Sequence, residues 1–290
     1  MNPPPDSDAE VWINGTWRRP SEATISVLDR GFLYGDGLFE TVRVHRGCLV
    51  RWSGHLQRLK AGARFLDIEI PHPDEQLTAV AVELVRRRGV PDGIVRLALS
   101  RGVGLRGYSP RGASRPTVVL THHPAEPLDV DPPRTWRLST SPYRIPEQDP
   151  LAPFKTANKL LQVLARAGAE RAGFDEALLL NTRGDVVEAT SGNLFWIEGD
   201  TLGTPPLSSG ALPGLTRRWV LELAGSLGIS AREEAVKPGR LTRADGVFLT
   251  LSALGIVGVG RLDNQPLPAS PLLQRLRHAY IAAVNAATPS

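Results

Sequence analysis

Reactive amines are scarce in this chain. Thirty of its 34 basic residues are arginine, so an amine that condenses with a carbonyl group must be Lys60, Lys155, Lys159 or Lys237. Lys155 and Lys159 lie four residues apart in a segment that we expect to open a helix near Pro153. The helix dipole and the neighbouring ammonium group would both disfavour a charge on Lys155. This pattern favours a neutral amine capable of Schiff-base chemistry, with a solvated basic stripe as the ordinary alternative.

A second group suited to chemistry is the carboxylate of Glu188, which lies in a short predicted strand after the turn at 182–184. A carboxylate that faces the nitrogen of a pyridine cofactor keeps that nitrogen protonated, and the ring can then accept electrons. A glutamate on a hairpin is more often part of its solvated face. Position in the sequence leaves both alternatives open.

An anion site is predicted at the start of a later helix. Thr216 is expected to be the N-cap of this helix, and the amide groups at that end can bind a phosphate group. Arg217 and Arg218 in the first turn oppose the helix dipole unless an anion is bound there. In so arginine-rich a chain, both arginines can equally be surface residues.

Residues 102–107 match the G-x-G-x-x-G pattern of dinucleotide-binding loops. That pattern requires a helix to begin in the loop, whereas Pro110 and Pro116 follow here and prevent one. A nicotinamide site is therefore excluded. The loop instead presents Arg101, Arg106 and Tyr108, which are suited to binding a carboxylate, although a solvated surface loop is about equally consistent with its composition.

The elements that must position these residues form an irregular series. Strands and helices do not alternate regularly, so the sequence predicts the α+β class. A proline-rich stretch predicts a linker at 124–134, between an N-terminal domain of residues 1–123 and a C-terminal domain of residues 135–290. The expected strands lie at 11–13, 16–18, 39–44, 48–50, 94–100, 115–121, 136–139, 177–180, 186–189, 193–197 and 247–251. The expected helices lie at 53–66, 75–88, from 153, after 216 and at 272–284.

Composition limits the class of protein. With 290 residues, 41% of them hydrophobic and 22% charged, the chain is typical of a globular protein of one or two domains. Its apolar runs are too short to cross a membrane, and the first residues, 1–6, are interpreted as a loose arm rather than a signal peptide. The net charge of +4 is spread along the chain, which favours anionic small substrates and a cofactor phosphate over nucleic acid.

Cysteine and histidine content set two further limits. Cys48 is the only cysteine, so the chain can form neither an internal disulfide nor a cysteine-built zinc site, and a cytoplasmic location is expected. His122 and His123 have no other ligand at metal spacing, so no metal site is expected.

Taken in order along the chain, these segments resemble the fold type IV pyridoxal-phosphate enzymes, which include branched-chain aminotransferases, D-amino-acid transaminases and aminodeoxychorismate lyases. The resemblance extends from residue 13 to about residue 267. Each motif alone is weak, whereas seven in family order are specific. The motifs lie at residues 29–41, 55–59, 101–108, 155–158, 188–195, 212–216 and 251–253.

The resemblance implies a fold and a cofactor. The fold would have a small N-terminal α/β sandwich and a larger C-terminal α/β barrel-like domain, with pyridoxal 5′-phosphate in the cleft. Lys155 would bind the cofactor covalently and transfer the proton, and Glu188 would face the pyridine nitrogen. The remaining cofactor-binding residues would be Arg58, Asn193, Leu215, Thr216 and Ser252. A non-catalytic basic binding protein on this scaffold is disfavoured because Lys155, Glu188 and Arg58 are all present.

The resemblance also implies how the substrate is bound. Phe39, Arg106 and Tyr108 would contact an amino substrate that carries a carboxylate, with the loop supplied by the partner subunit of a homodimer. Tyr108 replaces the histidine that the D-amino-acid transaminases have at this position.

Three features are most similar to the aminodeoxychorismate lyases. They are the loop at residues 100–110, the helix that follows Lys155, and the phenylalanine at position 39. The sequence therefore predicts an enzyme that converts aminodeoxychorismate to p-aminobenzoate and pyruvate. The alternative is a D-amino-acid or branched-chain transaminase with 2-oxoglutarate or pyruvate as acceptor. Leu254 and Gly258 depart from the lyase pattern, which usually has arginine and proline there, and both departures lie at the substrate end. They affect the identity of the substrate rather than that of the cofactor.

Overall fold

The computed structural model describes residues 9–288, and the predicted N-terminal arm lies outside the described residues. The chain forms two compact units. Unit 1 contains the described residues of 1–127, 154–158 and 285–290, and unit 2 contains residues 128–153 and 159–284. The chain first passes from unit 1 to unit 2 within the stretch proposed as a linker. Lys155 belongs to unit 1, although it follows that stretch in the sequence.

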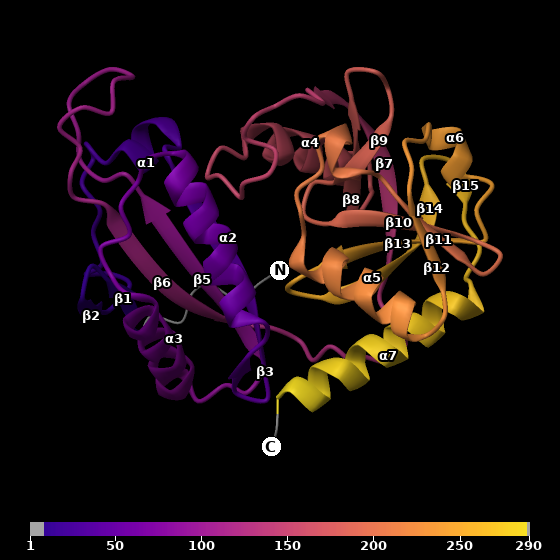
Figure 1. Ribbon diagram of the computed structural model, residues 1–290, viewed down its shortest axis with the longest axis horizontal. Helices are drawn as coiled ribbons and strands as arrows, with labels where there is room; N and C mark the ends of the chain where they lie inside the picture. Colours follow the sequence, from indigo (N-terminus) through magenta and orange to yellow (C-terminus); the bar gives the residue numbers. More distant parts are fainter. Residues whose placement is uncertain (1–8, 289–290) are drawn as a thin grey trace. The chain divides into compact units, whose positions relative to one another are not determined.

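Unit 1 is built on an antiparallel sheet with the strand order β2-β1-β6-β5-β3-β4 (Figure 1). Its strands are β1 (Val11–Ile13), β2 (Thr16–Arg18), β3 (Gly37–His45), β4 (Cys48–Leu49), β5 (Gly93–Ser100) and β6 (Thr117–Pro124). The short helix α1 (Arg30–Tyr34) precedes β3, and helices α2 (Trp52–Phe65) and α3 (Asp74–Arg88) pack on the sheet. The predicted first hairpin is confirmed, and Asn14 and Gly15 at its tip both have the positive φ that a type I′ turn requires.

Alternation of side chains along the strands gives this sheet two different faces. Val95, Leu97 and Leu99 of β5 join the apolar core beneath α2 and α3. Arg96 and Ala98, the residues between them, line a cavity on the opposite face. One face of the sheet therefore stabilises unit 1, and the other is available to bind a ligand.

Unit 2 contains a barrel-like sheet (Figure 1). Its strands are β7 (Thr135–Ile145), β8 (Glu176–Asn181), β9 (Val186–Ala189), β10 (Asn193–Glu198), β11 (Thr201–Thr204), β12 (Ser230–Glu233), β13 (Gly246–Leu251), β14 (Gly255–Leu262) and β15 (Gln265–Pro266). The order is β12-β11-β10-β13-β14-β7-β8-β9, and β9 also pairs with β10. Strands β10, β13, β14, β7, β8 and β9 therefore form a closed ring, and one apolar cluster contains residues from all of them.

Helices surround this sheet. They are α4 (Leu160–Arg171), α5 (Leu215–Ser226), α6 (Pro238–Leu241) and α7 (Pro271–Ala287), with a 3₁₀ turn at Leu207–Ser209. Ala165 and Ala169 of α4 pack against Ala177 and Leu179 of β8. The predicted α+β class, with an antiparallel N-terminal sheet and a barrel-like C-terminal sheet, is confirmed.

Two predictions about helix starts are wrong. The helix expected from Pro153 begins only at Leu160, because the preceding residues form backbone hydrogen bonds with β3. Lys155 is therefore not in a helical turn, and the helix dipole does not act on it as predicted. Helix α5 has Gly214 as its N-cap, and Thr216 is its second residue.

The sequence reading also missed several strands of unit 2, among them β11, β12 and β14. Strand β14 contains glycines at 255, 258 and 260, and β12 has an exposed, charged sequence, so neither has the alternating apolar pattern that identified the other strands. Within residues 9–288, each helix is too short or too polar to cross a membrane.

Candidate functional site

Lys155 lies in an extended segment that pairs with the first residues of β3. Its carbonyl oxygen accepts a hydrogen bond from the Phe39 N–H (2.9 Å), and the Ala157 N–H donates to the Gly37 carbonyl (2.9 Å). Thr156 forms a bridge with Leu38, so alternation places Lys155 on the same face as Phe39. The Nζ atom of Lys155 is 4.7 Å from the centroid of the Phe39 ring. Strand β3 therefore holds this amine beside an aromatic ring.

Two of the other three lysines are bound in surface ion pairs. Lys60 Nζ lies 2.8 Å from Asp74, and Lys237 Nζ lies 2.8 Å from Asp185. Their side chains are 42% and 63% exposed, so both ammonium groups are hydrated as well as paired. A paired, hydrated ammonium group is a poor nucleophile. Of the remaining two lysines, Lys159 occupies the N-cap position of α4, and only Lys155 lies against β3.

A buried ionic cluster lies on the helix-facing side of β3. The two carboxylate oxygens of Glu40 accept hydrogen bonds from Nε (2.8 Å) and Nη2 (2.7 Å) of Arg58 on α2, and His55 Nδ1 lies 2.7 Å from Oε2. Burial raises the pKa of Glu40, but the hydrogen bonds from Arg58 and His55 outweigh it and hold this pKa below its ordinary value. Burial also lowers the pKa of His55. A charged Glu40 thus fixes the orientation of Arg58, a predicted phosphate ligand.

The sequence reasoning did not identify Glu40 and His55. One signal was present: Glu40 interrupts the register of Leu38 and Val42, whose side chains face the core. A charge at an inward position requires a buried partner. Since His55 and Arg58 are three residues apart on α2, they share one helix face and could have been recognised as that partner.

A cavity of about 330 Å³ lies on the face of the sheet opposite α2 and α3. Its walls are mostly apolar, and Phe39 and Ala157 connect it to the segment that carries Lys155. The apolar residues that line it are Ile25, Val27, Phe32, Leu38, Phe39, Ala98, Leu99, Val119 and Ala157. Such a space suits an aliphatic side chain of a ligand.

Arg96 on β5 supplies a positive charge to this cavity, and the sequence reasoning did not identify it. Its guanidinium carbon lies 4.0 Å from the centroid of the Phe39 ring. Among residues 9–288, no carboxylate pairs with it. A guanidinium group held on an aromatic face is suited to bind a carboxylate of a ligand. In a chain with so many arginines, nothing in the sequence distinguished this one.

In unit 2, Glu188 and Asn193 lie opposite each other where β9 pairs with β10 and closes the barrel. The Asn193 amide donates to Glu188 Oε2 (3.0 Å) and to the Leu212 carbonyl (2.8 Å), and the Leu212 N–H donates to Glu188 Oε2 (3.1 Å). These bonds fix the plane of a half-buried carboxylate. The solvated-face alternative for Glu188 does not describe this environment.

The start of α5 supplies hydrogen-bond donors next to this pair. Within the part of the chain that the structure describes, the N–H groups of Leu215 and Thr216 have no backbone acceptor, and the Thr216 hydroxyl belongs to the same buried turn. Gly214 allows the approach to Asn193, because a Cβ there would lie 1.9 Å from Asn193 Oδ1. Ser252 directly follows β13, which pairs with β10.

The arginines in the first turn of α5 are engaged elsewhere. Arg217 is buried, lies 2.8 Å from a carboxylate oxygen of Glu233 and donates to the Pro205 carbonyl (3.1 Å). Arg218 is exposed and lies 3.8 Å from Glu222, one helical turn further on. The predicted anion site therefore rests on the backbone amide groups at this helix end and not on these two arginines.

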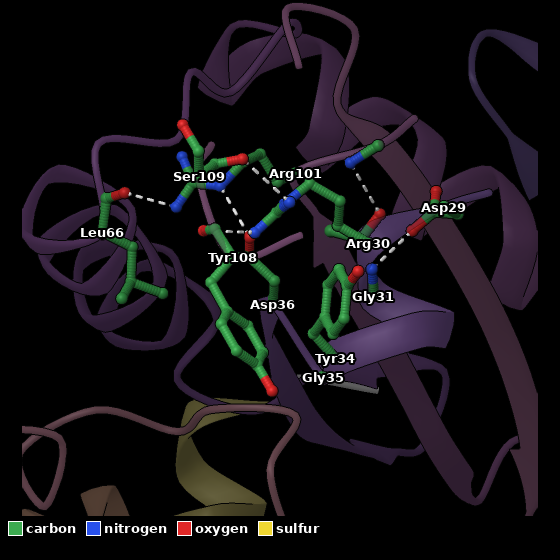
Figure 2. A network of polar contacts seen from close by, with 12 residues as sticks. Asp29, Arg30, Gly31, Tyr34, Gly35, Asp36, Leu66, Arg101, Tyr108 and Ser109 are labelled. Atoms are coloured by element: carbon green, nitrogen blue, oxygen red, sulfur yellow. Dashed lines mark hydrogen bonds and ion pairs between the residues drawn. The ribbon is translucent and has the colours of Figure 1, made fainter. Parts of the chain in front are cut away.

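The glycine-rich loop contains no helix between residues 101 and 116, as its two prolines predicted. Arg106 and Tyr108 are exposed, and Tyr108 is 89% accessible. Arg101 is different: it is buried, pairs with Asp36 (2.8 Å) and donates to the Leu66 carbonyl (2.7 Å). Figure 2 shows Arg101 and Arg30 on the two sides of Asp36. The prediction that Arg101 presents its charge to a carboxylate is therefore wrong, because its guanidinium group is buried and already paired.

These donor sets match the chemistry of pyridoxal phosphate. Backbone amides at a helix start and the hydroxyls of Thr216 and Ser252 suit a phosphate group. The fixed carboxylate of Glu188 suits a protonated pyridine nitrogen, and the amine of Lys155 suits the aldehyde. In the range 9–288, the structure contains no group of three or more acidic, histidine or cysteine side chains that could hold a metal ion.

The sequence pattern of the family described as amino-transferase class IV matches residues 37–262. This chain belongs to the class IV aminotransferase family. It is therefore an enzyme that depends on pyridoxal phosphate. Among the solved structures similar to it is the T.th. branched-chain amino acid aminotransferase with pyridoxamine 5′-phosphate. That structure has a TM-score of 0.91 and 29% identity, over 97% of this chain and 95% of the other.

Relatives of this class IV aminotransferase have two different names. A Methanocaldococcus jannaschii protein, provisionally named a branched-chain-amino-acid aminotransferase, is 37% identical over 88% of this chain and 88% of its own length. The aminodeoxychorismate lyase of Vibrio harveyi is 33% identical over 92% of this chain and 97% of its own length. The family is thus established, and the comparisons favour the transaminase alternative over the lyase.

The predicted site residues of this class IV aminotransferase fall into two sets. Unit 1 contains Phe39, Arg58, Arg106, Tyr108 and Lys155. Unit 2 contains Glu188, Asn193, Leu215, Thr216 and Ser252, and hydrogen bonds or strand pairing link Glu188, Asn193 and the start of α5. The assignment of both sets to one cofactor site stays a prediction.

Proposed function

We propose that this class IV aminotransferase transfers the amino group of branched-chain amino acids to 2-oxoglutarate. The observation that carries the proposal is the apolar cavity lined by Phe39, whose ring lies next to Lys155, because the walls of this cavity suit a branched aliphatic side chain. Arg96 adds a cation that suits the second carboxylate of a dicarboxylic acceptor. The provisional name of the Methanocaldococcus jannaschii relative supports the same substrate class.

In this proposal the chain's residues have three tasks. The amine of Lys155 would move the proton at the amine-bearing carbon of the substrate, and pyridoxal phosphate, when bound, would supply an electron-accepting ring. Arg106, Tyr108 and Phe39 bind the substrate. The cofactor-binding residues are Arg58, Lys155, Glu188, Asn193, Leu215, Thr216 and Ser252, with Glu188 holding a proton on the pyridine nitrogen.

A second candidate function is aminodeoxychorismate lyase, which releases pyruvate and needs no amino acceptor. Two observations favour it: the loop at 100–110 is similar to the lyase version, and the Vibrio harveyi lyase matches almost over its full length. Against it, Leu254 stands where lyases usually have arginine.

We also propose a homodimer in the cytoplasm, with the loop of one subunit serving the substrate of the other. A group of apolar residues on and before α1 is exposed and would be covered in such a dimer. These residues are Leu28 and Leu33, together with Ile25, Val27 and Phe32, which also line the cavity. The cytoplasmic location rests on the single cysteine of the sequence.

The two functions are separated by assays on the holoenzyme. L-Leucine, L-valine and D-alanine are offered with 2-oxoglutarate, and aminodeoxychorismate is offered without an acceptor. We expect glutamate to form from L-leucine and L-valine. Pyruvate release from aminodeoxychorismate, with no glutamate from the amino acids, would replace the proposal by the lyase.

Arg96→Leu should raise the KM for 2-oxoglutarate by about tenfold and the KM for L-leucine much less, since only the acceptor has a second carboxylate.

A further inference from the structure

The side chain of Arg30, the first residue of α1, is committed to the glycine-rich loop. Its Nη1 atom donates to the carbonyl oxygens of Gly107 (2.9 Å) and Ser109 (3.1 Å), and its Nη2 atom donates to that of Tyr108 (3.1 Å). Three successive carbonyl groups therefore converge on one guanidinium group. The backbone N–H of Arg30 also donates to the Gly102 carbonyl (2.8 Å), so both ends of the loop are attached to this residue.

The charge of Arg30 is balanced by Asp36. The Nε atom of Arg30 lies 2.8 Å from Asp36 Oδ2, and the same oxygen accepts a hydrogen bond from Arg101 Nε (2.8 Å) (Figure 2). Burial raises the pKa of Asp36, but the bonds from the two arginines outweigh it and keep this pKa below its ordinary value. Arg30 is only 3% exposed, so its cation is held in place by a charged partner and not by water.

Tyr34 completes the support of the loop. Its hydroxyl oxygen accepts a hydrogen bond from the Gly107 N–H (3.1 Å), and its ring lies 5.7 Å from the ring of Tyr108. The guanidinium carbon of Arg30 is 4.9 Å from the centroid of the Tyr34 ring. Figure 2 shows the two tyrosine rings near the Arg30 side chain. Helix α1 thus provides a rigid base for residues 107–109.

We propose that Arg30 is a positioning residue for substrate recognition. By fixing the backbone at 107–109, it sets the directions of the Arg106 and Tyr108 side chains, which are exposed next to the anchored carbonyl groups. In the part of the chain that the structure describes, Arg106 itself makes no ion pair or hydrogen bond, so only the backbone determines where its charge lies. The inference rests on the proposed role of this loop in binding the substrate carboxylate.

Lysine cannot replace arginine at this position. Arginine offers a planar fork whose N–H groups reach Asp36 and three carbonyl oxygens at once, whereas the single ammonium group of lysine cannot span them. Arg30→Lys therefore keeps the charge beside Asp36 and loosens the loop. The matched control is Arg43→Lys on β3, where a buried arginine pairs with Asp92 (2.5 Å) but does not contact the glycine-rich loop.

The test measures KM and kcat with L-leucine and 2-oxoglutarate, the affinity for pyridoxal phosphate, and the rate of trypsin cleavage after Arg106 and Arg111. For Arg30→Lys we expect a KM for L-leucine raised about tenfold, a kcat reduced less than about threefold, unchanged cofactor affinity and faster cleavage. Arg43→Lys should change none of these. In an Arg106→Leu background, Arg30→Lys should raise KM little further, because both changes act through the same contact.

The outcomes separate the two proposals. If Arg106→Leu leaves KM unchanged, the loop does not bind the substrate and that part of the proposed function fails, while faster trypsin cleavage in Arg30→Lys would still support the anchoring of the loop. If Arg106→Leu raises KM but Arg30→Lys does not, the positioning role is wrong. Should Arg30→Lys not fold, Asp36→Asn removes the charge partner instead and is expected to give the same pattern.

Discussion

At the scale of single residues, pairing with β3 rather than a helix sets the position of Lys155, the lysine proposed to react. The hydrogen bond from Phe39 to the Lys155 carbonyl fixes the backbone, and the ring of Phe39 lies beside the amine. Lys60 and Lys237, by contrast, are paired with surface carboxylates. Position against a strand, not the charge pattern along the chain, distinguishes Lys155 from these two lysines.

Replacing Lys155 should abolish the reaction. Lys155→Ala is expected to lower kcat by at least about a thousandfold and to leave no cofactor attached after borohydride reduction, because the amine both binds the aldehyde and carries the proton. Mass spectrometry of the reduced protein measures the attachment. Lys159→Ala, the control, should retain it. Attachment that persists in Lys155→Ala and disappears in Lys159→Ala would transfer the role to Lys159.

At the scale of elements, the predicted cofactor-binding residues of unit 2 depend on close contacts between β9, β10 and α5. Buried Glu176 on β8 accepts hydrogen bonds from Thr190 and Ser191, which holds the turn between β9 and β10. Gly214 at the start of α5 has φ −66° and ψ 136°, values that any residue can adopt. Glycine is required there by space and not by backbone conformation.

The close contact between Gly214 of the α5 start and Asn193 of β10 can be tested by adding a methyl group at position 214. In Gly214→Ala the new Cβ would lie 1.9 Å from Asn193 Oδ1, so Asn193 must move away from Glu188. We expect the Kd for pyridoxal phosphate to rise by about tenfold, measured by titrating the apoenzyme. Gly225→Ala in the same helix meets nothing within 4 Å and should leave the Kd unchanged while stabilising the helix slightly. Equal Kd values for both variants would contradict the predicted role of Asn193.

Strand β6 contains a histidine that should make unit 1 sensitive to acid. Burial, with smaller effects of Arg88 and His123, lowers the pKa of His122 to about 4, whereas in an unfolded chain it is about 6.5. The unfolded state therefore takes up a proton between these values that the folded state does not, and stability falls as the pH falls through this window. His122→Leu should reduce the loss of Tm between pH 7.5 and pH 5 by about 2 °C. His278→Leu, at an exposed position of α7, is the control. An unchanged pH dependence in His122→Leu would show that this ring does not contribute.

At the scale of the whole molecule, each unit stabilises its part of the predicted site in a different way. Unit 1 uses the two faces of one sheet, with its core on the side of α2 and α3 and the cavity on the other. Unit 2 closes its sheet into a ring, and the closing pair contains Glu188 and Asn193. Strand pairing also fixes residues far apart in the sequence, as it does for Lys155 and Phe39 in unit 1.

The proposed homodimer can be tested by mixing two variants, each impaired in a different part of the site, and assaying them at a substrate concentration well below the KM of Arg106→Leu. Light scattering should give a mass of about twice 31.4 kDa. If the loop of one subunit serves the other, Lys155→Ala and Arg106→Leu subunits that exchange should form mixed dimers with one intact site, and the mixture should regain up to about a quarter of the wild-type activity. A monomeric mass, or no gain after subunit exchange has been verified, would contradict a loop shared between subunits.

The sequence by itself determined the family, the cofactor and most of the strands of unit 1, because these follow from local patterns: motifs in order, alternation of apolar residues and a turn with positive φ. Only the tertiary structure decided that Lys155 pairs with the first residues of β3 and that Arg101 is structural. It also showed that three further residues lie next to predicted site residues, namely Glu40, His55 and Arg96. The physical reason is that these properties depend on contacts between residues distant in the chain. Such contacts override local preferences, as they do where pairing with β3 prevents a helix at Pro153.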